Sequence, residues 1–277
     1  MTVSCTPESA VASADAGEIA RRFVAARREA RSLPGYPGGL PISLDQAYER
    51  QDAAISLWRD PIVGWKVGRI PDLWLERMGE DRLMGPIFAG NLFAADPSPI
   101  LLPVIDGGFS AIEAEYIFVL GRDARADQLS WSIEQAADLV AELRVGIELA
   151  GSPLATINEL GPAVVVSDFG NNAGVVIGPE IPDWRSRRWD DMTCATWIDG
   201  DLVGRGGAMT LPGGPLAALA FALQRGARRG RSLRAGMIVS TGAASGIHDI
   251  RAGQCGRLVF DESLEMHCCA VRAEARA

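Results

Sequence analysis

The amino-acid sequence predicts a mixed α+β fold in which a helical N-terminal segment precedes a β-rich body. Helical periodicity marks roughly the first sixty residues, and short strand-like runs broken by glycine and proline follow from Val63 onward. Neither an internal repeat nor a low-complexity linker divides the chain. We therefore expect a helical segment over residues 1–62 and a single β-rich domain over residues 63–277.

Two amphipathic helices account for the N-terminal segment. They are expected over residues 14–33 and 43–60, and the second carries an apolar face that includes Leu44 and Ala47. The proline- and glycine-rich run of residues 34–39 separates the two helices, because neither residue type continues a helix readily.

Strands dominate the rest of the chain, and two helices interrupt them. The expected strands are residues 63–67, 100–104, 111–120, 145–149, 164–167, 174–177, 236–241 and 257–271. One helix is expected over residues 132–143, with Ser132 as its N-cap, and another over residues 215–229, which opens with proline. A hairpin over residues 193–205 is predicted because Asp199-Gly200 suits a two-residue turn with positive φ angles.

Composition and charge restrict the function classes. The chain is 48% hydrophobic and 22% charged, which is typical of a soluble folded protein. No apolar run approaches a membrane span, and the stretch through Ala30 lacks the apolar segment of a secretion signal, so we expect a cytoplasmic protein without membrane contact. A net charge of −8 opposes nucleic-acid binding. The arginine cluster of residues 225–234 is expected to be a solvated helix end.

Several common chemistries have little support in the sequence. The five cysteines are an odd number without a Cys-x-x-Cys motif, so we expect neither a zinc site nor a disulfide framework. His248 and His267 are expected to have structural or surface roles. A Gly-x-Ser-x-Gly motif, a phosphate loop and a dinucleotide fingerprint are absent from the sequence.

The most informative local pattern is a pair of glutamates in an apolar strand. Glu113 and Glu115 alternate with apolar residues in the run 111–120, so both carboxylates would lie on one face of the strand, about 6.6 Å apart along the chain. Oxygen ligands in this arrangement suit Mg²⁺, Mn²⁺ or Ca²⁺. The alternative is the solvated face of an ordinary half-buried strand.

Two further charged residues stand inside apolar runs. Glu148 follows the glutamate pair by one helical crossover, and three carboxylates around an ion would leave about three octahedral positions for water or substrate. Lys66 lies between a tryptophan and a valine, where a buried amine can transfer a proton or hold a substrate carboxylate. A lysine on the solvent-exposed face of the strand is the alternative.

Two polar turns are further candidates for a ligand pocket. Asp168 lies in the glycine-containing turn 166–174, between two apolar strands. Thr241 lies in the run 240–246, whose small residues would let the backbone approach a ligand closely. Both segments also fit ordinary tight turns.

Five motifs occur in a fixed order along the chain. They are Gly64-Trp65-Lys66-Val67-Gly68, Ile112-Glu113-Ala114-Glu115, Glu148, Ser167-Asp168 through Gly174, and Leu233 to Gly242. In this order they resemble the 2-keto-4-pentenoate hydratase and 4-oxalocrotonate decarboxylase family, which belongs to the fumarylacetoacetate hydrolase superfamily. The likeness extends from about Pro41 to about Gly253, and the order is more specific than any single motif.

The resemblance implies a fumarylacetoacetate hydrolase-like mixed β-roll with flanking helices, in which residues 63–277 form the catalytic domain. It implies a Mg²⁺ or Mn²⁺ ion and a 2-oxo acid substrate from aromatic ring-cleavage catabolism, bound by a homo-oligomer. Association with a pathway enzyme stays open. The residues that the resemblance assigns to the site are Lys66 as the catalytic residue, Glu113, Glu115 and Glu148 as metal ligands, and Asp168 and Thr241 as substrate-binding residues.

The activity that the resemblance favours is hydration of a 2-hydroxydienoate by a hydro-lyase. Three departures from the hydratase pattern affect this expectation. Gly90 stands where hydratases have an acid, Asp168-Phe169-Gly170 replaces Asp-Asn-Ala, and Gly213-Gly214-Pro215 replaces Gly-His-Pro. The alternatives are a decarboxylase of a 2-oxo-enedioate, which would use the same metal, and a catalytically silent partner subunit that keeps the fold.

Overall fold

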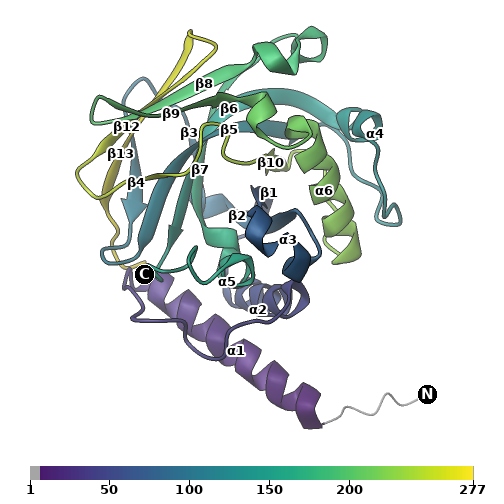
Figure 1. Ribbon diagram of the computed structural model, residues 1–277, viewed down its shortest axis with the longest axis vertical. Helices are drawn as coiled ribbons and strands as arrows, with labels where there is room; N and C mark the ends of the chain where they lie inside the picture. Colours follow the sequence, from purple (N-terminus) through teal and green to yellow (C-terminus); the bar gives the residue numbers. More distant parts are fainter. Residues whose placement is uncertain (1–6, 277) are drawn as a thin grey trace.

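The computed structural model describes residues 7–276, which form two curved β-sheets with the labelled helices below and to the right of them in the view of Figure 1. The helices are α1 (Pro7–Arg28), α2 (Leu44–Leu57), α3 (Asp72–Met78), α4 (Ile133–Ala137), α5 (Pro162–Ser167) and α6 (Gly214–Arg228). The strands are β1 (Ile62–Arg69), β2 (Arg82–Phe88), β3 (Leu92–Ala94), β4 (Ile100–Val104), β5 (Phe109–Leu120), β6 (Val140–Ser152), β7 (Asn172–Glu180), β8 (Thr193–Ile198), β9 (Asp201–Gly207), β10 (Ile238–Ser240), β11 (His248–Asp249), β12 (Cys255–Phe260) and β13 (Leu264–Arg272). This is the mixed α+β architecture that the sequence predicts.

The larger sheet has its two longest strands near its centre. Its order is β2-β1-β10-β5-β6-β7-β3, and β11 also pairs with β5. β5 and β6 run antiparallel and pair along almost their whole length. Residues 111–118 of β5 are all buried, so both faces of this strand are covered. An acidic side chain on such a strand points into the protein and not into bulk water.

The smaller sheet packs across the larger one. Its order is β4-β13-β12-β8-β9. The ring of Tyr116 on β5 meets the edge of Phe260 on β12, with 5.7 Å between the ring centroids, so aromatic contact joins the two sheets. The predicted hairpin is confirmed as β8 and β9, and its turn residues Asp199 and Gly200 have φ angles of 52° and 91°.

The N-terminal helices contact the β-rich body through buried polar groups. Arg27, near the end of α1, places its Nε atom 2.6 Å from Oδ1 of Asp168. The amide nitrogen of Gln51 on α2 donates hydrogen bonds to the carbonyl oxygens of Met84 and Val166, each at 3.0 Å. Within residues 7–276, none of the helices has both the length and the apolar character needed to cross a membrane. The division of the chain at residue 62 stays a prediction.

Three expectations about secondary structure are wrong. The helix expected over residues 132–143 ends at Ala137, although Ser132 caps it as predicted, because the chain pairs with β5 from Val140 onward and with β7 from Arg144 onward. Residues 164–167 belong to the short helix α5 and not to a strand. The strand expected over residues 257–271 is the hairpin of β12 and β13.

Two expectations about side chains are also wrong, the second of them in part. Cys255 and Cys269 are directly paired on β12 and β13 and form a disulfide, which the sequence could not indicate because the strand register was unknown. The arginine cluster is a solvated helix end only in part, because Arg228 and Arg234 are exposed but Arg229 is not. Arg229 is largely buried, lies over the ring of Tyr48 and pairs with Asp52 at 2.8 Å, so it joins the end of α6 to α2.

Candidate active site

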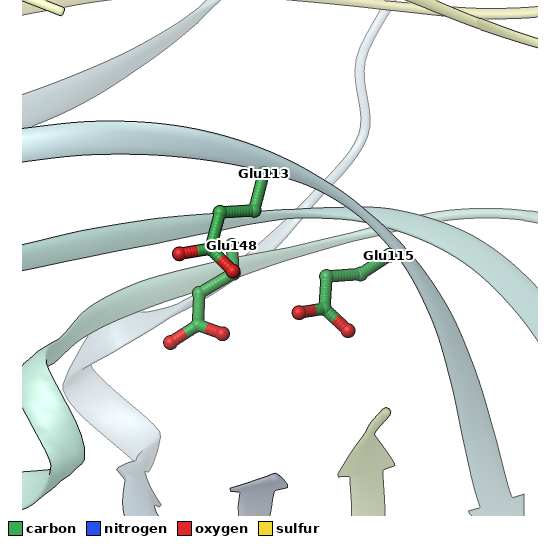
Figure 2. A group of neighbouring side chains, drawn as sticks. All are labelled: Glu113, Glu115 and Glu148. Carbon is green, nitrogen blue, oxygen red and sulfur yellow. The ribbon is translucent and has the colours of Figure 1, made fainter. Parts of the chain in front are cut away.

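Three glutamates meet on the central strands of the larger sheet (Figure 2). Glu113 on β5 lies directly opposite Glu148 on β6, and Glu115 lies two residues further along the same face of β5. Their relative exposures are 3%, 0% and 0%. One carboxylate oxygen of each residue lies within 4.8 Å of the corresponding oxygens of the other two. The structure thus brings together the three residues that the sequence suggested as metal ligands.

The hydrogen bonds around the carboxylates leave some of their oxygens free. Oε2 of Glu115 accepts a hydrogen bond from the backbone N–H of Gly242 at 2.6 Å, and Oε1 of Glu148 accepts one from the side-chain amide of Asn172 at 3.0 Å. The other oxygens of these two groups, Oε1 of Glu115 and Oε2 of Glu148, are buried without a hydrogen-bond partner in the described part of the chain. An unpartnered buried carboxylate oxygen is costly unless a cation or a donor meets it.

Burial and mutual repulsion raise the pKa values of the acidic cluster. Burial, followed by the charge of Glu148, raises the pKa of Glu113 to about 8. Burial raises the pKa of Glu115 well above its ordinary value, and Glu148 and Glu113 raise it further. A hard divalent cation would stabilise the ionised form of these buried carboxylates. Its charge offsets their mutual repulsion, and it prefers oxygen ligands. The donor set therefore fits a cation such as Mg²⁺ or Mn²⁺.

Lys66 lies beside this cluster and is itself buried, with 4% of its surface exposed. Its Nζ atom is 3.3 Å from Oε1 of Glu148 and donates a hydrogen bond to Oδ1 of Asn171 at 3.1 Å. Burial would lower the pKa of this amine, but the surrounding glutamates outweigh it and raise the pKa above its ordinary value. The alternative of a lysine on a solvent-exposed face is therefore wrong.

An unusual backbone turn presents Asn171 to the lysine. Phe169, Gly170 and Asn171 have consecutive positive φ angles of 55°, 65° and 54°. The turn lies so close to β2 that a Cβ atom on Gly85 would be 2.0 Å from the carbonyl oxygen of Phe169. Left-handed conformations cost free energy for non-glycine residues and are found at functional sites. The tight contact with Gly85 fixes the turn that carries Asn171.

The sequence contains one further signal for this site. Lys66 is the only lysine among the 27 lysine and arginine residues of the chain. At every other position where the chain carries a strong cation it uses arginine, which does not release its proton in proteins. Asn171 and Asn172 follow Gly170 directly, but nothing in the sequence showed that one would contact Lys66 and the other Glu148.

A cavity of about 740 Å³ leads from the surface to the cluster. Its buried lining residues include Lys66, Glu113, Asn171 and Thr241. The hydroxyl of Thr241 donates a hydrogen bond to the carbonyl oxygen of Tyr116 at 2.7 Å, so this residue borders the cavity with its proton already engaged. The glutamate cluster, the amine and the cavity thus meet in one place, as a small-molecule site requires.

Asp168 and Gly90 lie outside the cavity lining. Asp168 is fully buried, and its carboxylate is held by Arg27 and by the hydroxyl of Ser152, which donates at 2.6 Å. It does not border the cavity within the described chain, so this geometry disfavours the predicted role in substrate binding. Gly90 is exposed just after β2, beside Asp60, and is likewise absent from the cavity lining.

Two solved structures similar to this one are enzymes complexed with a divalent metal ion. The structure is similar to that of 4-oxalocrotonate decarboxylase from Pseudomonas putida G7 complexed with magnesium and adipate, with a TM-score of 0.77 and 16% identity over 98% of this chain and 100% of that chain. It is also similar to fumarylpyruvate hydrolase from Pseudomonas aeruginosa in complex with Mn²⁺ and pyruvate, with a TM-score of 0.54 and 19% identity over 77% of this chain and 91% of that chain. No curated protein sequence matches the chain.

The low identities mean that these likenesses establish the fold alone. Sequence evidence for the family is separate: the profile described as fumarylacetoacetate (FAA) hydrolase C-terminal matches residues 86–268, more than half of the chain. The matched region includes all three glutamates of the buried cluster. The chain therefore belongs to the fumarylacetoacetate hydrolase family, as the order of its motifs predicted.

Proposed function

We propose that the protein is a metal-dependent hydro-lyase that adds water to a 2-hydroxydienoate or a related 2-oxo acid from aromatic ring cleavage. The observation that carries this proposal is the position of the only lysine beside three buried glutamates, two of which keep an unpartnered oxygen, at a single cavity. The solved structures of similar fold with magnesium and adipate, or with Mn²⁺ and pyruvate, support a site for a divalent cation and a carboxylate ligand.

In this proposal the glutamates bind the metal ion, and Lys66 binds the substrate or transfers a proton. Glu113, Glu115 and Glu148 would hold Mg²⁺ or Mn²⁺ through the oxygens that the protein leaves free. A cation held there would supply positive charge to offset the negative charge that develops on the substrate's 2-oxygen. Lys66 would hold the carboxylate or transfer a proton to the reacting carbon chain, and Asn171 would fix the direction of its ammonium group.

The main alternative is decarboxylation of a 2-oxo-enedioate of the 4-oxalocrotonate type. One observation favours it, namely the likeness to a 4-oxalocrotonate decarboxylase over nearly the whole of both chains. The same cluster would then offset the charge of the dienolate that remains when CO₂ leaves. The two reactions differ in substrate charge, because decarboxylation requires a second carboxylate and hydration does not.

The first experiment follows the reaction by NMR with metal-stripped and Mg²⁺-loaded protein. We expect Mg²⁺-dependent conversion of 2-hydroxypenta-2,4-dienoate to the 4-hydroxy-2-oxo acid. Release of CO₂ from 4-oxalocrotonate, with no hydrated product from the monocarboxylate, would reject the hydratase in favour of the decarboxylase. Glu148→Gln should lower metal affinity on the order of 100-fold. Glu49→Gln, at an exposed position on α2, is the matched control and should leave metal affinity unchanged.

A catalytically silent partner subunit is the remaining alternative from a different class. It is supported by Gly90, which replaces an acid of the hydratase pattern. A silent subunit would fold and assemble but turn over neither substrate, with or without metal. We also propose a homo-oligomer from the family likeness, and mass photometry that finds only monomers would contradict this assembly.

A further inference from the structure

The cavity is much larger than a five-carbon dienoate requires. Its volume of about 740 Å³ corresponds to roughly two dozen water molecules at about 30 Å³ each. Pockets of roughly 300–1,000 Å³ bury ligands of drug size. A short 2-oxo acid bound to the glutamate cluster through its carboxylate end would therefore leave most of this space unfilled.

Apolar side chains make up much of the cavity lining. Six of them lie on α3, β2 and α5 and just before β11, and we call them the outer wall: Leu73, Trp74, Leu83, Pro162, Val165 and Ile247. Leu73 and Ile247 are 79% and 52% exposed, which places them at the opening. The indole of Trp74 lies against Gly161, where an added Cβ atom would be 2.7 Å from the ring. A large aromatic surface is thus held against the start of α5 and borders the cavity.

The positively charged residues of the outer cavity, Arg69 and Arg82, already have partners. Arg69 pairs with Asp72, with 2.6 Å between Nη2 and Oδ1. Arg82 pairs with Asp81 and donates a hydrogen bond to the carbonyl oxygen of Pro212. Asp249 adds a further negative charge to the lining. Among the described residues, the outer cavity therefore offers no excess positive charge to a second carboxylate.

We propose that the outer wall is a subsite for an apolar substrate tail, so that the protein acts on a 2-oxo or 2-hydroxydienoic monocarboxylate that carries a phenyl-sized or longer alkyl substituent. This inference rests on the proposed function for the position of the substrate's carboxylate end. The apolar wall gains from burying hydrocarbon, whereas a distal carboxylate would lose hydration next to Asp72 and Asp249 without gaining a free cation. The same argument favours the hydratase over the decarboxylase.

Calorimetric titration of the Mg²⁺-loaded protein tests the subsite with four stable 2-oxo acids. The probes are pyruvate, 2-oxohexanoate, 4-phenyl-2-oxobutanoate and 2-oxoadipate. Each fully buried methylene should strengthen binding about fourfold, so 2-oxohexanoate should bind at least tenfold more tightly than pyruvate, and the phenyl compound at least as tightly. 2-Oxoadipate has the same chain length as 2-oxohexanoate, and its second carboxylate should cost at least tenfold in affinity.

Variants at the opening of the cavity test whether the outer wall is the source of the affinity for the apolar tail. Leu73→Ser and Ile247→Ser should reduce the affinity for 4-phenyl-2-oxobutanoate several-fold more than the affinity for pyruvate. Leu129→Ser is the matched control, because Leu129 is 51% exposed and lies outside the cavity lining. It should change neither affinity.

The outcomes separate this inference from the proposed function. Metal-dependent binding of pyruvate with no gain from a longer tail would overturn the apolar subsite and leave the proposed function intact. Tighter binding of 2-oxoadipate than of 2-oxohexanoate would overturn the subsite in favour of a dicarboxylate substrate. Failure of all four acids to bind in a metal-dependent way would overturn the proposed function and this inference with it.

Discussion

Lys66 is the residue at which charge and proton transfer can be separated experimentally. An arginine at this position would keep the positive charge beside Glu148, but it would not release a proton. We expect Lys66→Arg to fold and to bind Mg²⁺ within a few-fold of the parent, while turnover falls by about 100-fold or more, since a positioned acid or base contributes on the order of 10²–10⁴. Thermal unfolding measures the stability of this variant, a metal titration measures its Mg²⁺ affinity, and the NMR reaction measures its turnover.

The opposite exchange at an exposed site is the control for Lys66→Arg. Arg228→Lys lies at the end of α6 and should leave metal binding and turnover unchanged. Full turnover by Lys66→Arg would contradict proton transfer by this residue and leave it only the role of holding the substrate carboxylate. Because the chain has no other lysine, selective ¹⁵N labelling of lysine gives a single side-chain signal that reports directly on Lys66.

At the scale of elements, the turn that carries Asn171 depends on a contact between two glycines. A Cβ atom on Gly85 would be 2.0 Å from the carbonyl oxygen of Phe169, and one on Gly170 would be 3.0 Å from Cα of Gly85. Neither neighbour is a flexible side chain, so the backbone must move. We expect Gly85→Ala to lower the free energy of unfolding by about 1–3 kcal/mol and to weaken turnover by displacing Asn171. Chemical denaturation and the NMR reaction measure both effects.

Gly35→Ala is the control for this steric argument. Gly35 has no atom within 4 Å of its added Cβ and does not have a positive φ angle. We expect its free energy of unfolding to stay within about 0.5 kcal/mol of the parent. A Gly85→Ala protein as stable and as active as Gly35→Ala would show that the turn tolerates displacement from β2.

The elements also show what could be predicted from the sequence and what could not. The alternation around Glu113 and Glu115 depends only on the two-residue period of a strand, so the shared face of the pair was predictable. The sequence suggested Glu148 as a third carboxylate, but its position opposite Glu113 depends on the strand register, which the sequence does not contain. Residues 138–143 have helical periodicity, yet pairing with the neighbouring strands determines most of their structure. Tertiary pairing overrode local propensity there.

At the scale of the whole molecule, the ion pair of Arg27 and Asp168 joins α1 to the segment that precedes the Asn171 turn. Both side chains are almost completely buried, and the guanidinium also donates to the carbonyl oxygens of Gly151 and Asn172. Removing one partner of a buried pair leaves an uncompensated charge, which costs about 3–5 kcal/mol. We expect Arg27→Met to lose this much free energy of unfolding in denaturant titrations.

Two further variants test whether the loss of stability in Arg27→Met arises from the unpaired charge of Asp168. Arg27→Met combined with Asp168→Asn should recover part of the lost stability, because no buried charge is then left without a partner. Arg21→Met removes an exposed arginine that pairs with Glu18 and should cost less than about 1 kcal/mol. Equal losses for Arg27→Met and Arg21→Met would show that the buried pair does not stabilise the molecule.

The acidic cluster links the stability of the whole molecule to pH and to metal. The pKa of Glu113 is about 8 in the folded protein, against 4.5 for an ordinary glutamate, and that of Glu115 is also raised. Because the pKa of Glu113 is raised in the folded state, this group contributes its full stability below pH 4.5. The contribution is lost as the pH increases to about 8. The pKa of Lys66 is shifted upward from 10.5, so its effect falls outside this range.

We therefore expect the stability of the metal-free protein to fall with pH and the stabilisation by metal to grow with pH. In EDTA, the free energy of unfolding should fall by on the order of 1 kcal/mol per pH unit between about pH 5 and 8, because the buried carboxyls lose their protons. In saturating Mg²⁺ the gain over the EDTA sample should grow with pH, since the ion binds only the ionised carboxylates. Urea titrations at each pH measure both trends. In Glu113→Gln, the fall in EDTA should become shallower. A stability in EDTA that increases with pH over this range would mean that the three glutamates already share compensating charge without a metal.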